Sequence, residues 1–494
     1  MNIVDRSMDE FFIYWITIFI LLFALLYRLP SVIKKLWEAY IMSNIPFHEF
    51  PGVKLPPGTM GYPLIGETLQ FFKKGGEFYK EKVETYGFIY KTHLLGRPTI
   101  RVIGADNVKK ILLSENVLVT HNWPTSARLL LGTGSISQSS GHVHKIRRKN
   151  MMHAFRLDEM DKMVPVMQDV IRSNLEEWKS KRDIYTYPQS KLMAFTVSAC
   201  TLVGSDMTSL INSGMHDVFK QILDNIFSIP LDIPGFGFRK GMNAKRQLLS
   251  MLESILSDVD KRPYTPILKA HYESSSKLGM ESIEEINEGV IDLLFAGHET
   301  ITSVSTNCVM FLGKNKSVVE KLRDELRENN LLKHKGEEFT PLDLQTINNL
   351  KYLHCVMKEV LRLCPPAGGG FRKALQSFEL GGYLIPKDWS IIVSIRETQH
   401  LSPLFKHSEM FDPDRWNDDK LDKGAERFHY LPFGMGARGC VGKTYAQIVI
   451  KVFIIELVRT CDWTLKNENI QMRYIPVPVA SDYLPATFYD PALN

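Results

Sequence analysis

The sequence predicts a mainly α fold with a small β-sheet portion, preceded by a single N-terminal transmembrane helix. Long runs with helical spacing of apolar residues fill most of the chain, most clearly over 281–312. Shorter β-rich runs bounded by turn residues occur over 88–103 and 378–395. The chain has 494 residues, 44% of them hydrophobic and 23% charged. This balance is typical of a globular protein and excludes a disordered or collagen-like chain.

The N-terminal segment Phe11–Tyr27 contains seventeen residues without a charge. As a helix it would rise about 26 Å, close to the thickness of a hydrocarbon core. The basic residues Arg28, Lys34 and Lys35 follow it, which predicts that the rest of the chain stays in the cytosol. A cleaved signal peptide is the alternative, but the preceding residues are acidic and no small-residue cleavage site follows. We therefore expect residues 1–50 to form a membrane anchor with its flanks.

A proline-rich hinge is expected over 51–67, because its prolines hold the chain extended and prevent a helix. No linker interrupts the remainder, so residues 68–494 are expected to form one large domain. The expected elements of this domain are a hairpin of 88–94 and 99–103 around a turn at 95–98, helices over 142–155, 281–312, 317–329 and 445–460, and short strands within 378–395.

Charge and cysteine content exclude several classes of protein. The formal net charge is +5, which is too mild to indicate nucleic-acid binding. The six cysteines are dispersed and form no C-x-x-C pair. This pattern argues against a disulfide scaffold and against a structural zinc site, and it fits a compartment that keeps thiols reduced.

The segment Phe433–Gly442, with the sequence FGMGARGCVG, carries the most specific chemical signal. Its glycines let the backbone pass close to a flat, bulky group. Backbone N–H groups and the start of a helix near Gly442 would favour a thiolate at Cys440. A thiolate on such a loop suits an axial iron ligand. The alternative is an inert buried cysteine in a turn.

This F-x-x-G-x-R-x-C-x-G pattern resembles the haem-binding loop of the cytochromes P450, the haem-thiolate monooxygenases. The resemblance implies the P450 fold, haem b as the cofactor, Cys440 as the axial ligand of the haem iron, and Arg438 as a partner of a haem propionate. Phe433 and Gly434 would line the haem on the same loop.

A second motif, Ala296–Thr300 (AGHET), lies inside the long apolar helix. A mid-helix glycine costs about 1 kcal/mol relative to alanine, so a compensating role is expected. The motif resembles the distal helix of the cytochromes P450, which implies that Thr300 and Glu299 deliver protons for oxygen cleavage. Many relatives have a second hydroxyl residue after this threonine, whereas this chain has Ile301.

Three charged residues resemble the structural network beneath the haem loop of the family. Glu359 and Arg362 are spaced i, i+3 and would share one helix face, and Arg415 follows in the segment FDPDRW. The role implied is structural, since losing one partner would leave a buried charge at a cost of about 3–5 kcal/mol.

A basic run on the helix expected over 142–155 has two interpretations. A solvated face is the default. The family resemblance places Arg148 against a haem propionate, with His144 in place of the usual tryptophan, and leaves the remaining cations Lys145, Arg147 and Lys149 to attract an acidic electron-donor domain. Gly132–Gly134 lacks the third glycine and the preceding strand of a phosphate-binding loop, so no such site is predicted.

Several segments resemble the retinoic-acid hydroxylases, the family 26 group of animal cytochromes P450: Leu55–Phe72, Tyr86–Leu113, Gly369–Leu375 and Cys461–Leu465. The resemblance implies hydroxylation of all-trans retinoic acid, chiefly at ring carbon 4, with dioxygen and electrons from NADPH through a reductase. It also implies residence in the endoplasmic reticulum membrane.

Pocket residues implied by the resemblance are Trp123, Phe227, Phe295 and Phe371, and Arg372 would meet a propionate. Small residues at Ala367 and Gly368 would enlarge the pocket. Arg97 and Arg101 are both candidates for the substrate carboxylate. Two alternatives remain at this stage, a monooxygenase of another lipophile such as a sterol or terpenoid, and a non-catalytic haem-binding sensor or carrier.

Overall fold

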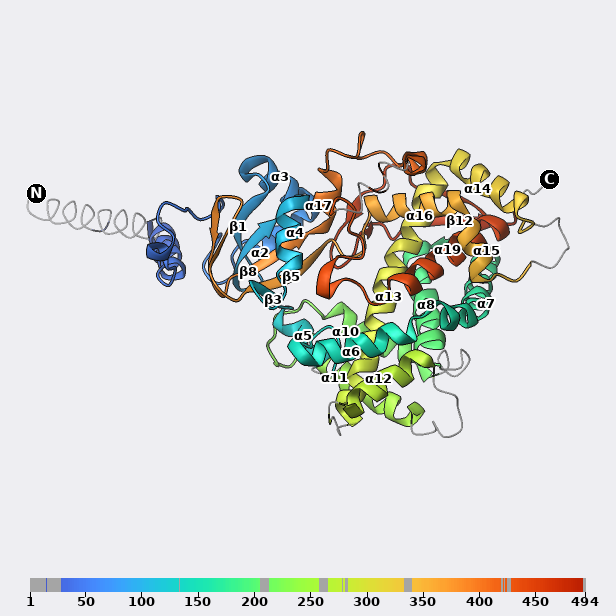
Figure 1. Cartoon of the computed structure of the whole chain (residues 1–494), viewed down its shortest axis with the longest axis horizontal. Coiled ribbons are helices and arrows are strands. Elements are labelled where there is room, and N and C mark those ends of the chain that lie inside the picture. The colour runs from blue at the N-terminus through green and yellow to red at the C-terminus, as the bar shows by residue number, and fades with distance from the viewer. Residues whose placement is uncertain are drawn as a thin grey trace, which may run out of the picture. The chain divides into compact units, whose positions relative to one another are not determined.

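The computed structural model describes residue 15 and residues 28–132, 134–204, 213–256, 265–277, 279, 283–332, 340–418, 421, 423 and 428–491. Contacts divide the chain into two units. Unit 1 comprises residues 1–101 and 376–391, and unit 2 comprises 102–375 and 392–494. The chain is mainly helical with small sheets, as the sequence predicts (Figure 1), and most of the helices belong to unit 2.

Unit 1 combines a few short helices with two strand pairs. Its elements are a helix over 28–42, η1 (Phe47–Glu49), α2 (Thr68–Lys74), α3 (Gly76–Tyr86), β1 (Ile89–Leu94), β2 (Arg97–Val102), β6 (Phe378–Leu380) and β7 (Tyr383–Ile385). Two strands cross the boundary between the units, since β2 ends at Val102 of unit 2 and β8 (Ser390–Ser394) begins in unit 1 and ends in unit 2. The expected hairpin is confirmed, with a tighter turn than predicted, because only Leu95 and Gly96 connect β1 to β2. Both have positive φ, which matches the twist of a two-residue hairpin.

The structure describes the predicted hinge but not the predicted membrane-spanning segment. Residues 51–67 run without a helix, and isolated bridges join Lys54 to Tyr383 and Gly58 to Lys91. Phe11–Tyr27, apart from Trp15, lies outside the described residues. Among the helices that are described, none combines the length and apolar character needed to cross a bilayer. The transmembrane helix therefore stays a prediction.

Unit 2 is predominantly helical. Its helices are α4 (Ala105–Leu113), α5 (Thr125–Leu131), α6 (Gly141–Ala154), α7 (Leu157–Lys181), α8 (Thr186–Ser198), η2 (Ala199–Val203), α10 (Met215–Asp224), α11 (Gly237–Leu256), α12 (Pro266–Lys277), α13 (Ile283–Lys314), α14 (Lys316–Glu328), α15 (Leu344–Asn349), α16 (Lys351–Leu363), α17 (Ile395–His400), η4 (Pro413–Asn417), η5 (Gly436–Arg438) and α19 (Lys443–Thr460). The helices predicted over 142–155, 281–312, 317–329 and 445–460 are confirmed by α6, α13, α14 and α19, with ends shifted by one or two residues.

Small antiparallel sheets complete unit 2. Its strands are β3 (Val119–His121), β4 (Asp183–Tyr185), β5 (Gly369–Ala374), β9 (Asp462–Leu465), β10 (Met472–Arg473), β11 (Val479–Ala480) and β12 (Pro485–Tyr489). β3 pairs with β5, β10 with β11, and β12 lies between β4 and β9. The register of the first pair sets His121 opposite Arg372. Two segments that are far apart in sequence thereby bring polar side chains together.

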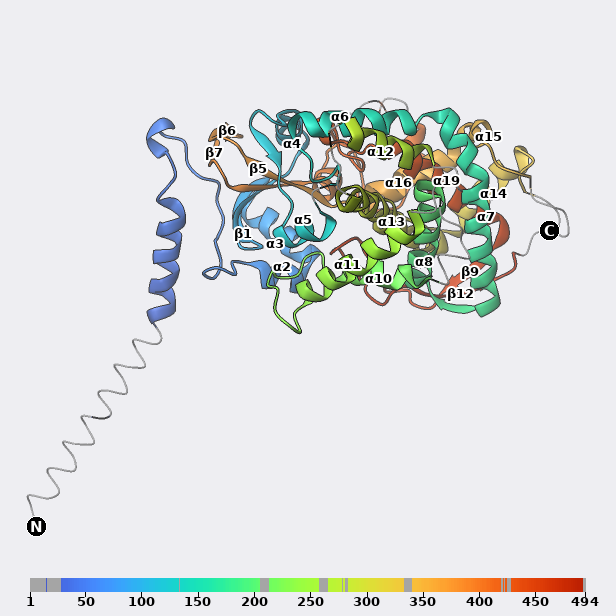
Figure 2. The ribbon, with the colours of Figure 1, turned by 90° about the horizontal axis from the view of Figure 1, so that it is seen from below.

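The helix α13 is central to the packing of unit 2 (Figures 1 and 2). It contacts α8 most extensively, and it also packs against α16 and α19. One apolar core fills the space among α7, α13, α16 and α19, and a second joins α13 to α5, α10 and α11. Because α13 borders both cores, its residues are apolar on most sides, and its polar residues need specific partners.

Candidate active site

The glycine-rich loop before α19 is shaped by backbone hydrogen bonds. The Cys440 N–H donates to Phe433 O at 2.8 Å, and the Gly434 N–H donates to Leu431 O at 2.9 Å. Gly436 has φ +72°, and a Cβ there would come within 2.4 Å of Leu112 O. Glycine is therefore required at 436, because the end of α4 passes directly against the loop.

Cys440 is accessible at the surface of the loop, and its thiol lies close to positively charged groups. Its residue is exposed by accessible surface, and yet burial is the main cause that raises the pKa of its thiol. A hydrogen bond from the Gly442 N–H and the charges of Arg148 and Lys443 act to lower the same pKa. The backbone donor expected near the start of α19 is thus present, although burial outweighs it. An accessible thiol with a backbone donor and positive charges beside it is suited to act as a metal ligand.

Two of the predicted haem-contacting arginines meet at one carboxylate. The Arg438 Nε donates to Glu115 Oε1 at 3.0 Å, and the Arg372 Nε lies 3.2 Å from Glu115 Oε2. The Arg438 Nη2 also lies 2.8 Å from His121 Nδ1, and His121 Nε2 lies 2.9 Å from Gln138 O. His121 therefore donates through Nε2 and accepts from Arg438 through Nδ1, which requires a neutral ring. Burial, followed by the Arg438 charge, lowers the pKa of His121 accordingly.

The basic run on α6 divides into buried and exposed residues. Arg148 Nη1 donates to Gly439 O at 2.6 Å, which ties α6 to the cysteine loop. Arg147 is buried and donates to Ser135 O and Ser139 Oγ, so its expected place on an electron-donor surface is wrong. Lys145 and Lys149 are exposed. The single basic run thus has a structural side and a solvent side.

The AGHET residues of α13 point in different directions. Ala296 is exposed and Thr300 half-exposed, and the Thr300 Oγ1 donates to Ala296 O at 2.7 Å. Glu299 is buried and faces α8, where Lys191 Nζ lies 2.8 Å from its Oε1. Burial is the largest single influence and acts to lower the pKa of Lys191, but the charges of Glu299 and Tyr187 and their hydrogen bonds to the lysine together outweigh it, so the net pKa is raised. The two residues predicted to deliver protons therefore lie on different faces of one helix.

The mid-helix glycine is explained by packing. A Cβ at Gly297 would come within 2.7 Å of Ser198 Oγ and 3.1 Å of Leu202 Cδ1, so α8 and η2 approach α13 closely at this point. Gly132 and Gly134 have a similar explanation, because a Cβ at either would overlap with Glu288 or Glu285 of α13. These glycines allow close approach to α13 and do not form a phosphate loop.

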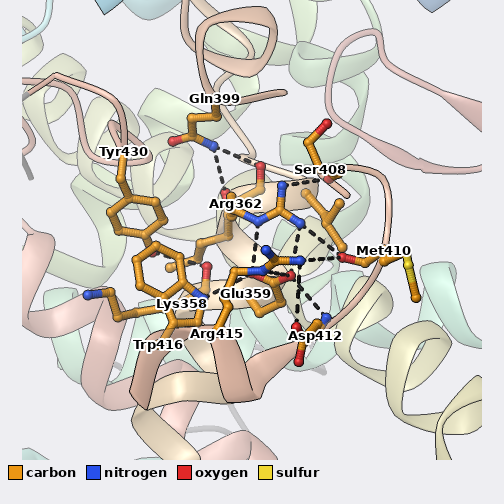
Figure 3. A network of polar contacts seen from close by, with 12 residues as sticks. Lys358, Glu359, Arg362, Gln399, Ser408, Met410, Asp412, Arg415, Trp416 and Tyr430 are labelled. Atoms are coloured by element: carbon orange, nitrogen blue, oxygen red, sulfur yellow. Dashed lines mark hydrogen bonds and ion pairs between the residues drawn. The ribbon is translucent and has the colours of Figure 1, made fainter. Parts of the chain in front are cut away.

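The predicted network of Glu359, Arg362 and Arg415 is assembled and buried (Figure 3). Arg362 donates to Glu359 through Nε and Nη2, both at 2.8 Å, and Arg415 Nε donates to it at 2.9 Å. The Trp416 indole N–H also donates to Glu359, at 2.9 Å. A single buried carboxylate thereby receives two guanidiniums and an indole.

Gln399 connects this network to the cysteine loop. Its Nε2 donates to Arg362 O at 2.8 Å, and its Oε1 accepts from the Leu431 N–H at 2.7 Å (Figure 3 shows the first contact). Gln399 is fully buried. The network therefore supports the segment that leads into Phe433 and Gly434 by direct hydrogen bonds.

Aromatic pocket candidates come together from three segments. The Trp123 ring centroid lies 6.1 Å from that of Phe295 on α13 and 6.1 Å from that of Phe371 on β5. Phe227 packs against the same apolar core as Trp123 and Phe295. Ala367 is exposed, and a Cβ at Gly368 would meet nothing within 4 Å. Arg101, one candidate for a substrate carboxylate, is buried in unit 1 with its guanidinium 3.8 Å from the Tyr79 ring centroid.

Sequence reasoning missed four residues that complete these clusters, namely Glu115, Lys191, Gln399 and Trp416. Trp416 had a usable signal, since it directly follows Arg415 in FDPDRW. The other three lie far in sequence from their partners, and a lone Glu, Lys or Gln carries no pattern of its own.

The residues present fit a haem. Cys440 offers an accessible thiol, and Arg148, Arg372 and Arg438 interact electrostatically with one another or with that thiol. Among the described residues, Glu115 is the one carboxylate placed against these guanidiniums. The three cations exceed it by two positive charges, which equals the charge of the two carboxylates of a haem.

Comparison with known proteins identifies the family of the chain. The cytochrome P450 family model matches residues 56–482. Cytochrome P450 26B1 of Xenopus tropicalis is 40% identical over 443 residues, covering 88% of this chain and 86% of that protein. Cytochrome P450 26A1 of Danio rerio is 39% identical over 469 residues, covering 92% and 94%.

A solved structure is also similar, that of retinoic-acid-bound cyanobacterial CYP120A1. Its TM-score is 0.82 at 31% sequence identity, and the match covers 89% of this chain and 100% of that one. The family match over residues 56–482 includes the segment that carries the cysteine loop. The chain belongs to the cytochrome P450 family and is a P450 monooxygenase of the retinoic-acid-hydroxylase type.

Proposed function

We propose that the protein hydroxylates all-trans retinoic acid, at ring carbon 4, with dioxygen and with electrons that a reductase draws from NADPH. The observation that carries this proposal is the aromatic contact of Trp123 with Phe295 and Phe371 in a protein whose fold matches a retinoic-acid-bound relative. Flat aromatic walls suit a polyene with a trimethyl ring. The likeness to cytochromes P450 26A1 and 26B1 supports the same substrate.

The proposed haem site uses the residues of the cysteine loop and its neighbours. Cys440 would ligate the iron, Phe433 and Gly434 would line the ring, and Arg438, Arg372 and Arg148 would hold the propionates. A bound haem supplies the activation of dioxygen for insertion of one oxygen atom into a C–H bond. The protein supplies the enclosed space, the orientation of the substrate and the protons.

Proton delivery is proposed to use Thr300 and Glu299. The Thr300 hydroxyl lies on the half-exposed face of α13 and can hold or pass a proton at Oγ1. Glu299 is held toward Lys191, so a proton carried by its carboxylate must compete with the lysine charge. Ile301 is buried in the core, so no second hydroxyl residue directly follows Thr300.

The partner and location are proposed from the surface. Lys145 and Lys149 are exposed on α6 and could attract an acidic domain of the reductase.

The helix over 28–42 exposes Leu29, Val32, Ile33 and Leu36 at helical spacing, which supports a membrane-facing role for this end of the chain. We propose a single-pass anchor in the endoplasmic reticulum with the catalytic part in the cytosol. Deleting residues 1–27 should then release the protein from microsomes.

The substrate proposal is tested with the full-length protein, reductase, NADPH and retinoic acid. We expect a 4-oxidised product and a substrate-induced change in the haem spectrum. Trp123→Ala should weaken retinoate binding by roughly tenfold, since a large apolar wall is lost. The exposed aromatic Tyr489→Ala serves as the control. If the parent protein gives no 4-oxidised product and no spectral change with retinoic acid, the proposal is ruled out.

A second candidate is a monooxygenase of another lipophile, such as a sterol or terpenoid. The observation that favours it is the open space at Gly368, next to exposed Ala367. Gly369 cannot carry a side chain in the same way, because a Cβ there would lie 2.6 Å from Val393 O. Gly368→Val should therefore reduce turnover of a bulky lipophile more than turnover of retinoate. An equal effect on both would remove the support for this candidate.

A further inference from the structure

Glu115 joins three separate segments of unit 2 beside the cysteine loop. It lies between α4 and β3, whereas Arg372 belongs to β5 and Arg438 to η5. Its Oε1 accepts from Arg438 Nε and from the backbone N–H of His121, and its Oε2 lies 3.2 Å from Arg372 Nε. The Glu115 side chain is 3% exposed. Burying a carboxylate costs free energy, and the three partners from three segments compensate for that cost.

Hydrogen bonds fix the plane of the Arg438 guanidinium, and the charge of Glu115 holds the Arg372 guanidinium nearby. Arg438 directs Nε toward Glu115 Oε1 and Nη2 toward His121 Nδ1, whereas Arg372 Nε lies 3.2 Å from Glu115 Oε2 as an ion pair without the geometry of a hydrogen bond. The Arg372 Nη1 donates to Phe371 O at 2.9 Å. A guanidinium has five donors in a rigid plane, so fixing one edge aims the remaining donors.

Glu115 also balances charge. Burial lowers the pKa of Arg372 and of Arg438, and the Glu115 charge acts to raise both. Without this carboxylate, two like charges would face each other with no described anion between them. Repulsion and desolvation would then favour rotation of the arginines away from their present positions.

We propose that Glu115 is a positioning residue for the cofactor, and that it aims Arg372 and Arg438 at the haem propionates while leaving the arginine cluster with a charge that matches two carboxylates. This inference rests on the proposed haem site. It makes Glu115 a determinant of haem retention and of the haem reduction potential, although Glu115 itself need not touch the haem.

The test measures haem transfer from the holoenzyme to apomyoglobin and the haem midpoint potential. Glu115→Gln should lose haem about tenfold faster, because a charge-assisted contact is lost and the arginines are less well held. Its potential should shift in the positive direction, since a negative charge near the haem has been removed. Glu115→Asp keeps the charge with a shorter reach, so its potential should stay at the parent value while haem loss is intermediate.

A matched control is Glu67→Gln. Glu67 is also a buried carboxylate in an ion pair, with Lys82 Nζ at 2.5 Å, but it belongs to unit 1. Its substitution should lower stability without moving the potential. A merely structural role for Glu115 would give the same result as this control, and that result would overturn the inference.

The remaining outcomes are also decisive. If Arg372→Gln and Arg438→Gln both retain haem like the parent, the proposed haem site fails whatever Glu115 does. If these two lose haem faster and Glu115→Gln does not, the inference about Glu115 fails alone. If Glu115→Gln yields no holoenzyme, Glu115→Asp decides, and unchanged haem loss in that variant overturns the proposal.

Discussion

Lys191 Nζ of α8 lies 2.8 Å from Glu299 Oε1 of α13, and both side chains are buried. The pair couples the helix that carries the AGHET motif to its most extensive packing partner. The same lysine also interacts with the Tyr187 hydroxyl, so its charge is shared by two oxygen groups. Glu299, which sequence reasoning assigned to proton delivery, is therefore also a buried counter-charge.

Removing Lys191 should destabilise the protein strongly. Lys191→Met leaves Glu299 buried without its cation, and we expect the free energy of unfolding to fall by about 3–5 kcal/mol. The double variant Lys191→Met/Glu299→Gln should recover part of this loss, because no uncompensated charge remains. Urea unfolding of each variant at pH 7 measures the effect. Lys220→Met is the control, since Lys220 and Asp224 form an exposed pair on α10 that contributes little.

Thr300→Val should separate electron consumption from product formation. The Thr300 Oγ1 is the half-exposed hydroxyl of α13, and without it proton supply for oxygen cleavage should fail. We expect less hydroxylated product and more hydrogen peroxide for each NADPH consumed. Thr302→Val is a matched control, because Thr302 donates to His298 O in the same way but is fully buried. Unchanged product and peroxide in Thr300→Val would contradict the assignment of Thr300.

Cys440→Ala should abolish the thiolate-type haem spectrum. Cys440 is the accessible cysteine of the Phe433–Gly442 loop, and no other sulfur is described on that loop besides Met435. We expect either colourless protein or haem with an altered spectrum after expression with ample haem precursor. Cys200→Ala, which changes a half-buried cysteine packed against the apolar cores, should keep the parent spectrum. An unaltered spectrum in Cys440→Ala would exclude it as the ligand.

The Glu359 network predicts an order of stabilities. Glu359→Gln deprives two buried arginines of their counter-charge and should cost about 3–5 kcal/mol. Trp416→Phe removes one hydrogen bond to the same carboxylate and should cost about 1–3 kcal/mol. Chemical denaturation measures both losses of stability when it is followed by backbone circular dichroism, a signal that does not depend on Trp416. A larger loss in Trp416→Phe than in Glu359→Gln would show that the indole, and not the charge pairing, dominates.

Stability should fall as the pH drops from 6.5 toward 4 because of His144. Burial, together with Arg438, Arg148 and His121, lowers the pKa of His144 to about 4. Between about pH 4 and pH 6.5 the unfolded chain binds a proton at His144 that the folded protein does not bind. The stability associated with the neutral histidine is therefore fully present above pH 6.5 and is lost progressively as the pH falls below that value.

One such histidine changes the free energy of unfolding by at most about 1.4 kcal/mol per pH unit. His144→Gln should reduce the fall in unfolding free energy between pH 7 and pH 5. The exposed His142→Gln on the same helix should leave it unchanged. His93 and His354, whose pKa values are also about 4, contribute in the same direction and remain in both variants.

Family membership narrows the interpretations left open by the sequence. The match to the cytochrome P450 family over residues 56–482 sets aside a non-catalytic sensor or carrier in favour of a monooxygenase. The choice between retinoic acid and another lipophile stays with the product assay and with Gly368→Val.

The sequence by itself determined the features that depend on residues close together in the chain. The Phe433–Gly442 loop, the AGHET helix and the i, i+3 spacing of Glu359 and Arg362 are local patterns, because a turn or a helix face brings their members together. For the same reason the expected hairpin and the four helices predicted over 142–155, 281–312, 317–329 and 445–460 have ends within a few residues of the observed ones.

Only the tertiary structure decided which distant side chains compensate the buried charges. Lys191 reaches Glu299, and Glu115 reaches Arg372 and Arg438, across 108, 257 and 323 residues of sequence. The tertiary structure also places Arg147 in the interior, and it brings Ser198 so close to Gly297 that a larger residue would not fit there. Burial and close approach are properties of packed segments, and a single residue in a sequence carries no record of the segment that will lie against it.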